Sequence, residues 1–391
     1  MSKTIIIIGA GLAGLSAALQ AAENGCNVKL VSSLPSERAQ SVMAEGGINA
    51  ALNTKDENDS PEEHFTDTIK AACGLADPNA VWGMTQAAPE LVHWLLKLGV
   101  KFNMSGYDDV DLRNFGGQKK KRTAFAQSDT GKQIMTAMID AVRRKEASGM
   151  VERFSHHSFL TLRLCGNICC GCVIRDEYSQ ETVELPGDAV IVATGGMHGL
   201  FGNTTGSLSN TGEVTAELFR LGVPLANGEM IQYHPTTVKC GGKRMLISEA
   251  ARGEGGRLFA MKDGKQWYFM EEKYPELGNL MPRDITAREI WKVSHESEVF
   301  LDMTEISEEI ISNKLSGLVD DCMTYLHKDI RKEPVSVLPG IHYFMGGILV
   351  DEQHRTPIQN LYAAGECCAQ YHGANRLGGN SLLGALYGGR V

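Results

Sequence analysis

The stretch IIIIGAGLAG at residues 5–14 decides the fold of this 391-residue chain. Its isoleucines predict a fully buried strand over residues 3–8, and the pattern over 12–24 predicts a helix that Gly25 ends. A second, parallel strand is expected over 27–32. Gly9, Gly11 and Gly14 permit a tight turn, and the following helix offers free backbone N–H groups to a pyrophosphate. We therefore expect a dinucleotide-binding βαβ unit at the start of the chain.

The composition is typical of an α/β protein without a general affinity for nucleic acid. A length of 391 residues predicts about two domains. The 43 glycines and the 22% charged fraction indicate an ordered chain with many tight turns. Because the formal net charge is −9, an anionic substrate would have to be held by local arginines. The basic run at 119–122 is short and lacks interleaved aromatic residues, and we interpret it as a solvated loop.

Neither export nor membrane insertion is expected. No apolar run approaches the roughly 20 residues of a membrane span, and the N-terminal stretch lacks the basic region and cleavage site of a signal peptide. The ten cysteines are too scattered for a disulfide framework, which favours a reducing cytoplasm. The CxxC spacing at 169–172 has no second pair, so we interpret it as part of a strand and expect no metal.

The rest of the chain predicts a second unit inserted into the first. Helices are expected over 62–73 and 81–98, and a small meander of strands over 158–164, 168–176 and 182–185 leads to an apolar strand over 189–193. After His234 the pattern changes to mixed helix and loop, with helical segments at 285–291 and 307–326. Buried-strand character resumes at Gly340. Nothing resembles an internal repeat or a flexible linker, so the units should pack together.

Three nucleotide-binding signals occur in order along the chain. The second strand ends in Ser32 and Ser33 rather than an acid, so ribose recognition is expected to rest on Ser32 or on backbone. DAVIVATGG at 188–196, with Thr194 and Gly195, and TPIQNLYAAGE at 356–366, ending in Glu366, look like later flavin-contacting segments of two-dinucleotide-binding flavoproteins. Together with the glycine turn they predict FAD.

Further motifs make a resemblance specific. The chain resembles the flavoprotein subunits of fumarate reductase and succinate dehydrogenase, a superfamily that also contains L-aspartate oxidase. The matching stretches are MAEGG at 43–47, RNFGG at 113–117, QYHPT at 232–236, SEAARGEGG at 248–256, PRD at 282–284, HYFMGG at 342–347 and HGANRLGGNSL at 372–382.

The resemblance implies an α/β architecture with an inserted cap. A Rossmann-like FAD-binding domain would comprise residues 1–232 and 345–391, and an α+β capping domain would comprise 233–344. The chain stops at Val391, where family members continue with a helical domain, so that domain is expected to be absent. An inactive FAD-binding fragment of a larger flavoprotein subunit is accordingly one alternative.

The resemblance also assigns site residues for reducing fumarate or a related small 2-enoate dicarboxylate to succinate. Reduction needs hydride from flavin N5, a proton, and restraint of both carboxylates. Arg283 would donate the proton, and Glu249 and Arg252 would bring it from solvent. His234 and His342 alone would more often be structural, and only their flanking motifs favour a role in binding. The implied substrate contacts are His234, Ser248, His342, Arg376 and Phe115, and the implied cofactor contacts are Gly9, Gly11, Gly14, Ser32, Gln40, Gly46, Gly47, Thr194, Gly195, Glu366, Asn380, Ser381 and Leu382.

Two departures from the family pattern bear on how FAD is attached and on which reaction is catalysed. Many members attach FAD covalently through a histidine at the position of Gln40, so FAD is expected to be non-covalent here and the protein to act as a reductase. L-aspartate oxidase also lacks that histidine, but it carries a glutamate where this chain has Phe115, which favours fumarate reductase. Electrons would come from an iron–sulfur subunit or another donor, because no cysteine spacing here suits a cluster. Such subunits could also hold the protein at the inner membrane.

Overall fold

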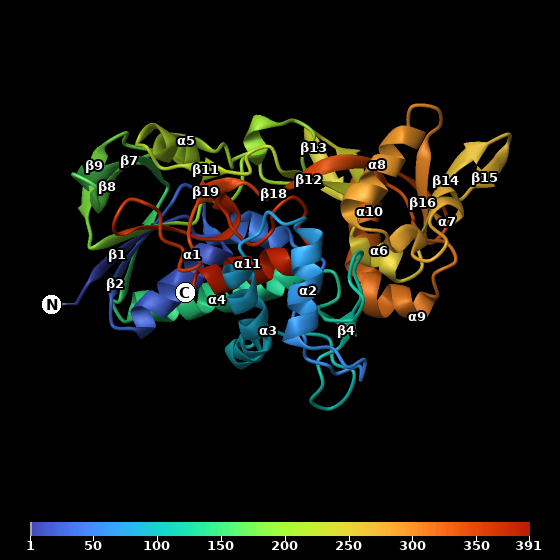
Figure 1. Ribbon diagram of the computed structural model, residues 1–391, viewed down its shortest axis with the longest axis horizontal. Coiled ribbons are helices and arrows are strands. Elements are labelled where there is room, and N and C mark those ends of the chain that lie inside the picture. Colours follow the sequence, from blue (N-terminus) through green and yellow to red (C-terminus); the bar gives the residue numbers. More distant parts are fainter. Residues whose placement is uncertain (1) are drawn as a thin grey trace.

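A five-stranded parallel sheet runs through the larger part of the molecule, and the computed structural model describes residues 2–391 (Figure 1). Its strand order is β20-β10-β1-β2-β6, with every neighbouring pair parallel. The strands are β1 Thr4–Ile8, β2 Asn27–Ser32, β6 Val151–Ser155, β10 Ala189–Val192 and β20 Leu361–Ala363.

The predicted βαβ unit is confirmed. Strand β1 lies at the centre of the sheet, and Ile6 and Ile7 are fully buried, as expected for a parallel strand covered on both faces. Helix α1 (Leu12–Glu23) follows, and Gly25 has a left-handed φ of 77° just beyond it. Strand β2 has the predicted bounds.

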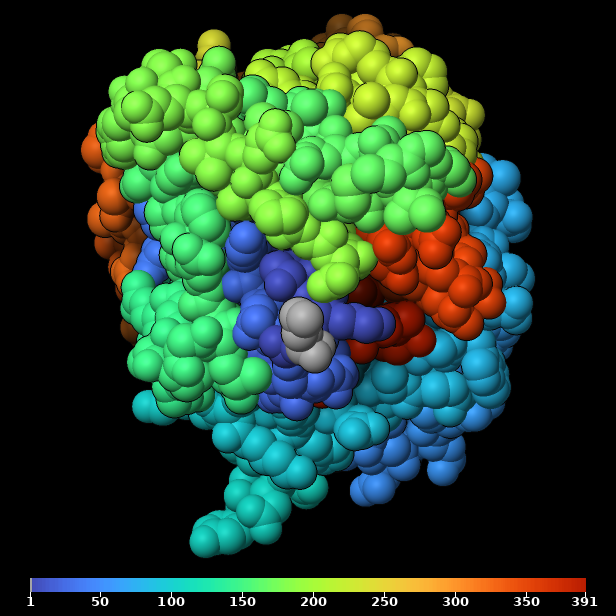
Figure 2. All heavy atoms as spheres, turned by 90° about the vertical axis from the view of Figure 1, so that its left-hand side faces the viewer, coloured from blue at the N-terminus to red at the C-terminus, as the bar shows by residue number. Residues whose placement is uncertain are grey.

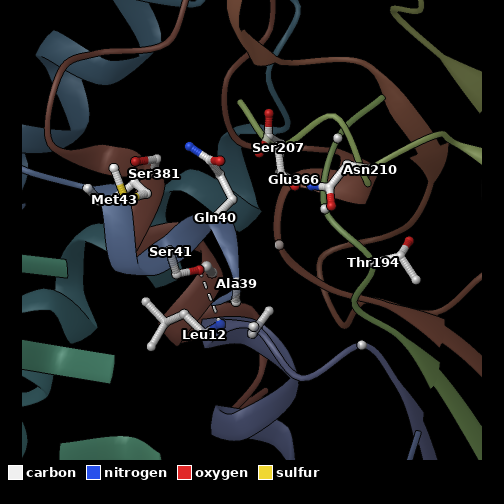
Figure 3. Close-up of a pocket in the computed structure, with 18 of the residues that line it drawn as sticks. Leu12, Ala39, Gln40, Ser41, Met43, Thr194, Ser207, Asn210, Glu366 and Ser381 are labelled. Atoms are coloured by element: carbon white, nitrogen blue, oxygen red, sulfur yellow. Dashed lines mark hydrogen bonds between the residues drawn. The ribbon is translucent and has the colours of Figure 1, made fainter. Parts of the chain in front are cut away.

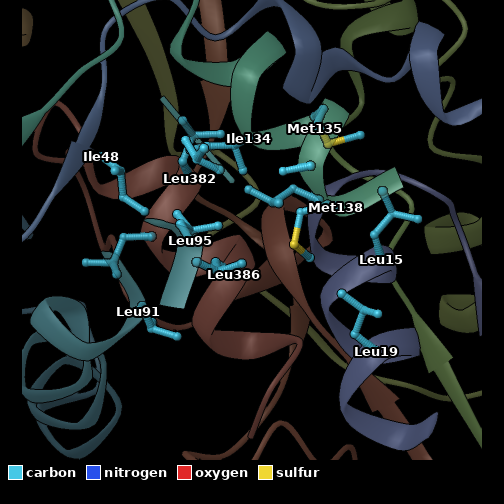
Figure 4. Packing of buried hydrophobic residues seen from close by; sticks show 14 of the residues in the cluster. Leu15, Leu19, Ile48, Leu91, Leu95, Ile134, Met135, Met138, Leu382 and Leu386 are labelled. Atoms are coloured by element: carbon cyan, nitrogen blue, oxygen red, sulfur yellow. The ribbon is translucent and has the colours of Figure 1, made fainter. Parts of the chain in front are cut away.

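Helices α1, α3, α4 and α11 contribute to the largest hydrophobic core (Figure 4). Leu15 and Leu19 of α1 meet Met138 of α4 and Leu386 of α11 there. Helix α3 begins three residues before its predicted start because Asp77 accepts hydrogen bonds from the first backbone N–H groups. The helices are α2 Pro61–Ala71, α3 Pro78–Leu98, α4 Thr130–Ala147, α5 Glu213–Arg220 and α11 Asn380–Gly388.

The predicted meander is an antiparallel sheet of order β7-β8-β9. Its strands are β7 His157–Cys165, β8 Ile168–Asp176 and β9 Thr182–Pro186. Two further three-stranded sheets join distant parts of the chain: β11 Leu225–Ala226 with β19 Gly347–Leu349 and β21 Cys368–Ala369, and β3 Ile48–Asn49 with β5 Thr123–Ala124 and β4 Leu112–Arg113.

Residues 238–337 supply all of a second hydrophobic core except Phe115. This yellow and orange segment lies at one end of the long axis in Figure 1. Strands β12 and β18 pair with each other and connect it to the rest of the molecule. The strands are β12 Ile231–Cys240, β13 Lys243–Leu246, β14 Arg257–Lys262, β15 Lys265–Trp267, β16 Val299–Asp302, β17 Val335–Ser336 and β18 Leu338–Phe344, and the helices are α6 Glu249–Gly253, α7 Phe269–Lys273, α8 Arg283–Val293, α9 Glu308–Ile310 and α10 Ser316–Leu326.

The prediction of a solvated basic loop at 119–122 was wrong for Arg122. Its side chain is fully buried, with Nη2 2.8 Å from an oxygen of Asp59 and Nη1 3.0 Å from an oxygen of Asp67. Two buried carboxylates compensate the buried guanidinium, a pairing that the local sequence does not reveal. Across residues 2–391, the helices all fall short of the length and apolarity needed to cross a membrane.

Candidate active site

The glycines between β1 and α1 have two different structural roles. A Cβ on Gly9 would lie 2.2 Å from the carbonyl oxygen of Ala193, and one on Gly14 would lie 1.9 Å from that of Gly9. These two glycines therefore allow close backbone packing. A Cβ on Gly11 would meet no protein atom nearer than 3.6 Å, and Gly11 lines a cavity. Its missing side chain leaves room at the helix N-terminus for a ligand.

One cavity of about 320 Å³ extends from this N-terminus to the inserted segment. Most of the predicted site residues line it, although they come from segments far apart in the sequence. The predicted residues in its wall are Gly9, Gly11, Ser32, Gln40, Gly46, Gly47, Phe115, Thr194, Gly195, His234, Ser248, Glu249, Arg283, His342, Glu366, Arg376, Ser381 and Leu382.

The cofactor side of the cavity is lined by short polar side chains (Figure 3). The hydroxyl of Ser41 accepts a hydrogen bond of 3.3 Å from the backbone N–H of Leu12, at the start of α1. Gln40 extends its amide into the open space between Ser381 and Ser207. The Oγ of Ser32 is buried and has no hydrogen-bond partner, so it is free to meet a polar ligand group such as a ribose hydroxyl.

Arg283 anchors the opposite end of the cavity. Its Nε and Nη2 donate to one oxygen of Glu249 at 2.8 and 2.7 Å, and its Nη1 donates to Gln232 at 3.0 Å. Arg283 is the first residue of α8, and Glu249 begins α6, so two helix starts of the inserted segment position the pair.

Glu249 joins Arg283 to a second arginine. Its other oxygen accepts from the N–H of Gly116 at 3.0 Å and lies 3.4 Å from Nη2 of Arg252. Burial alone would raise the pKa of Glu249, but the two guanidinium groups hold it below its ordinary value. Arg252 is itself buried, does not line the cavity and donates to the carbonyl of Asn279 at 2.5 Å. The passage of protons from solvent through Glu249 and Arg252 to Arg283 stays a prediction.

Two histidines face each other near Arg283. The rings of His234 and His342 have centroids 5.1 Å apart, and Nδ1 of His342 pairs with the hydroxyl of Thr205 at 2.8 Å. Burial, reinforced by the charge of Arg283, lowers the pKa of both histidines well below the ordinary value. Both are therefore neutral at pH 7, and the buried Nε2 of His234 has no hydrogen-bond partner.

Arg376 provides a second cation in the same cavity. Its guanidinium lies 4.3 Å from the centre of the Tyr343 ring, and its buried Nε has no partner. Burial and the charge of Arg283 lower the pKa of Arg376 to about 9, so it remains protonated at pH 7. Ser248 caps α6 by accepting from the backbone N–H of Ala250, which leaves its hydroxyl proton free to donate.

Glu366 is one of the carboxylates that line the cavity. It accepts from the backbone N–H of Phe344 at 3.0 Å and lies 3.1 Å from Nε2 of His198.

Phe115 is 2% exposed, and a Cβ on Gly46 would lie 2.7 Å from its ring. The phenylalanine therefore closes one wall of the cavity with an apolar surface.

The structure does not bring Gly14 or the Asn380 side chain to the cavity. Asn380 is fully buried, accepts from Asn49 at 2.7 Å and donates to Thr68 at 3.0 Å, and its oxygen lies 2.9 Å from Nε2 of His64. These side-chain hydrogen bonds fix the start of α11, and contact of the Asn380 backbone with the cofactor stays a prediction.

Three residues that were not predicted contact the predicted site residues. Gln232 accepts from Arg283 and donates to the backbone oxygen of Arg376 at 2.7 Å, so it links the two cations. It belongs to the QYHPT motif, and that membership was the available signal. Tyr343 beneath Arg376 belongs in the same way to the HYFMGG motif, whereas none of the matching stretches contains Thr205, which lies beside His342. Among residues 2–391 no cluster of three metal-binding side chains occurs.

The residues that line the cavity suit FAD in their chemistry. The glycine turn and the N-terminus of α1 would hold the pyrophosphate, Ser32 the ribose, and Gly46, Gly47, Ser381 and Leu382 the flavin end. A family model described as FAD binding domain matches residues 4–382. The chain belongs to the FAD-binding oxidoreductase family of succinate dehydrogenase and fumarate reductase flavoproteins.

Individual relatives agree with this membership. The chain is 45% identical to the succinate dehydrogenase flavoprotein subunit of Bacillus subtilis, matching 100% of this chain and 68% of that protein. It is 34% identical to L-aspartate oxidase of Streptomyces coelicolor, and the match covers 100% of this chain and 68% of that protein. The E. coli quinol fumarate reductase FrdA structure superposes with a TM-score of 0.92 at 30% identity, covering 100% of this chain and 69% of that one. The chain thus spans about two thirds of the length of these relatives.

Proposed function

We propose that this protein reduces fumarate, or a related small 2-enoate dicarboxylate, to the saturated acid with non-covalently bound FAD. The observation that carries the proposal is the position of Arg283. It faces the same cavity as His234, His342 and Arg376 and is held by the buried carboxylate of Glu249.

The cation arrangement favours a ligand with two carboxylates. Arg283 and Arg376 repel each other in a buried cavity that contains Glu249 as their nearby anion. A dicarboxylate would relieve that repulsion and satisfy the unpartnered Nε atom of Arg376 and the Nε2 atom of His234. Neutral histidines and Ser248 would add hydrogen bonds without adding charge.

Proton delivery is the part of the reaction that the chain's own residues perform. When bound, reduced FAD would supply hydride to one alkene carbon. Arg283 would release a proton to the neighbouring carbon, and Glu249, 2.7 Å away, would pass a replacement proton to it. Arg252 would stabilise the ionised form of Glu249 between turnovers. The apolar wall formed by Phe115 would help to exclude water from the developing carbanion.

We also propose that residues 233–344 form the capping domain and that residues 1–232 and 345–391 form the FAD-binding domain. The separate hydrophobic core of residues 238–337 and the two connecting strands support this division. Because His234, Ser248, Glu249, Arg283 and His342 belong to the proposed cap, movement of the cap would assemble or open the substrate site.

The electron donor is proposed to be an iron–sulfur subunit or another external reductant. The relative from Bacillus subtilis is named as a subunit, which supports a partner. With such a partner, the protein would act in the cytoplasm or at the inner membrane through its partner subunits.

Two other reactions are candidate functions and should be assayed in parallel. Succinate oxidation is a candidate because the identity to a succinate dehydrogenase subunit is 45%, whereas it is 34% to a fumarate reductase subunit from Haemophilus influenzae. L-aspartate oxidation is a candidate from the match to that enzyme, although Phe115 offers the substrate ammonium no charge partner.

The test follows oxidation of a reduced viologen by fumarate, with succinate plus dye and aspartate plus oxygen measured on the same FAD-loaded sample. Arg283→Ala should lower fumarate turnover by about 10²- to 10⁴-fold. Arg288→Ala is the matched control, because Arg288 lies on the same helix with a side chain 61% exposed. Fumarate turnover that survives Arg283→Ala would discredit the proton donor. Comparable rates in both directions would remove the reductase assignment, and inactivity with every acid would favour an inactive FAD-binding fragment.

A further inference from the structure

Two thiols lie in contact at the tip of the β7–β8 hairpin, outside the proposed active site. Cys165 is the last residue of β7 and Cys170 lies in β8, and their Sγ atoms are 3.1 Å apart. Cys165 is exposed and Cys170 is half-buried, so reagents in solution can reach the pair. Figure 2 shows the side of the molecule to which this green hairpin belongs.

A β-bulge brings the two thiols together. Leu164 pairs with Cys169 across the hairpin and Arg163 pairs with Gly171, so Cys170 is an extra residue without a partner in the ladder. The next residue, Gly171, has a φ of 140°, and a Cβ there would lie 2.1 Å from the carbonyl oxygen of Leu185. Glycine at 171 is therefore required for the backbone path that presents Cys170 beside Cys165.

The other two cysteines of the hairpin point away from this pair. Cys169 and Cys172 are fully buried in the hydrophobic core that also contains Ile174. Burial raises the pKa of the Cys172 thiol to about 12, which leaves it protonated and unreactive at neutral pH. The hairpin therefore separates one accessible thiol pair from two buried thiols.

We propose that Cys165 and Cys170 are a thiol modification site. Low-molecular-weight disulfides would oxidise the two thiols to a reversible disulfide between Cys165 and Cys170. The Cys165 thiolate would attack one sulfur of the reagent, releasing the first small thiolate and forming a mixed disulfide. The Cys170 thiolate would then attack the Cys165 sulfur and release the second small thiolate. The two protein thiols are oxidised, the reagent is reduced to two thiols, and the two protein protons pass to these products.

The required movement is small and the affected segment is defined. A disulfide needs its sulfur atoms about 2.05 Å apart, so the pair must close by about 1 Å. The hairpin tip is tied to the segment before β20, because Cys169 donates its N–H to the carbonyl of Gln359 at 2.8 Å and Gln359 donates back to Asn167 at 3.0 Å. The bond would cross-link the tip that supports this segment.

The test treats the folded, FAD-loaded protein with oxidised glutathione, blocks free thiols with N-ethylmaleimide and digests with trypsin. Residues 164–175 form one tryptic peptide that contains all four hairpin cysteines. The oxidised peptide should weigh two hydrogen atoms less than the same peptide with free thiols at Cys165 and Cys170, regain that mass with dithiothreitol, and fragment as the Cys165–Cys170 isomer. That isomer should exceed the Cys165–Cys169 and Cys165–Cys172 isomers by about tenfold or more in the folded protein, and not in urea.

Single variants complete the design. Cys170→Ser should stop at a glutathione adduct on Cys165, and Cys165→Ser should leave the peptide without any disulfide. Cys73→Ser is the matched control, because Cys73 is exposed and remote in sequence, and it should not alter the hairpin disulfide. A stable glutathione adduct in the unmodified chain, free thiols throughout, or equal amounts of the three isomers in the folded protein would overturn the proposal. Because those readouts use the unmodified chain, they hold even if a variant fails to fold.

Discussion

Replacing Glu249 by glutamine is the sharpest perturbation of the proposed site. Glu249 is 2% exposed, and its oxygens accept from both Arg283 and Gly116 and face Arg252. Glutamine keeps the shape of the side chain but removes its charge and replaces one acceptor oxygen with a donor. The substitution therefore leaves two buried guanidinium groups without their common anion.

The loss of stability caused by Glu249→Gln should depend on pH. Removing one partner of a buried ion pair costs about 3–5 kcal/mol. Because the pKa of Glu249 is lowered from 4.5, folding favours its ionised form. Its stabilising effect is thus fully present above about pH 4.5 and is lost as the pH falls through the folded-state pKa. The gap in unfolding free energy between the original chain and Glu249→Gln should be largest near pH 7 and should narrow in acid.

The catalytic change follows from the proton relay. A positioned proton-transfer group contributes about 10²- to 10⁴-fold to rate, equivalent to about 3–5 kcal/mol in the barrier. The assay is fumarate-dependent oxidation of a reduced viologen, expressed per bound flavin, with urea unfolding on the same preparations. Glu271→Gln is the control, since Glu271 pairs with Arg257 in the same segment with a side chain 37% exposed and should change stability by only about 0–1 kcal/mol.

Two results would contradict the roles assigned to Glu249. If Glu249→Gln keeps full flavin content and turns over fumarate within about tenfold of the original rate, Glu249 carries no proton in the reaction. An unfolding free energy equal to that of the original chain at pH 7 would likewise contradict the assigned ion pairs.

Three further predictions concern the cofactor and the buried imidazoles. Acid precipitation should release the yellow colour into the supernatant because Gln40 offers no imidazole for attachment, and a coloured pellet would contradict this. Gly14→Ala should destabilise the protein by about 1–3 kcal/mol, whereas Gly11→Ala should weaken FAD retention with little change in apoprotein stability, as flavin release and thermal unfolding can show. Because His234, His342 and His372 are held neutral, stability should decline below about pH 6.5 by up to about 1.4 kcal/mol per pH unit per histidine; identical urea midpoints at pH 7.5 and 5.5 would contradict this.

Local patterns were sufficient for the elements whose residues interact with near neighbours in the sequence. The isoleucines of β1, the glycine turn and the spacing of α1 specify a βαβ unit without reference to the remaining chain. The same holds for the β7–β8–β9 meander, where turns join consecutive strands. The site residues that share one cavity were reached through the family motifs, because spacing alone does not reveal which distant segments meet.

The prediction that failed, for Arg122, and the unforeseen contacts of Asn380 both involve polar side chains whose partners lie far along the chain. Arg122 is buried because Asp59 and Asp67 fold back onto it, and no feature of the basic run indicates that pairing. Asn380 is turned inward by Asn49 and His64, more than 300 residues earlier. Such pairings depend on tertiary packing, so they could be found only once the helices were placed.

The arrangement of β20 and α11 has a consequence for folding during synthesis. Strand β20 pairs with β10 at the edge of the central sheet, and Ser16 of α1 donates to the carbonyl of Leu386 in α11 at 2.7 Å. At about 5–20 residues per second, the ribosome makes these partners roughly 20–70 s after β1 emerges. The isoleucine-rich strand β1 is therefore made long before the sheet that buries it is complete, and its apolar side chains stay uncovered during that interval.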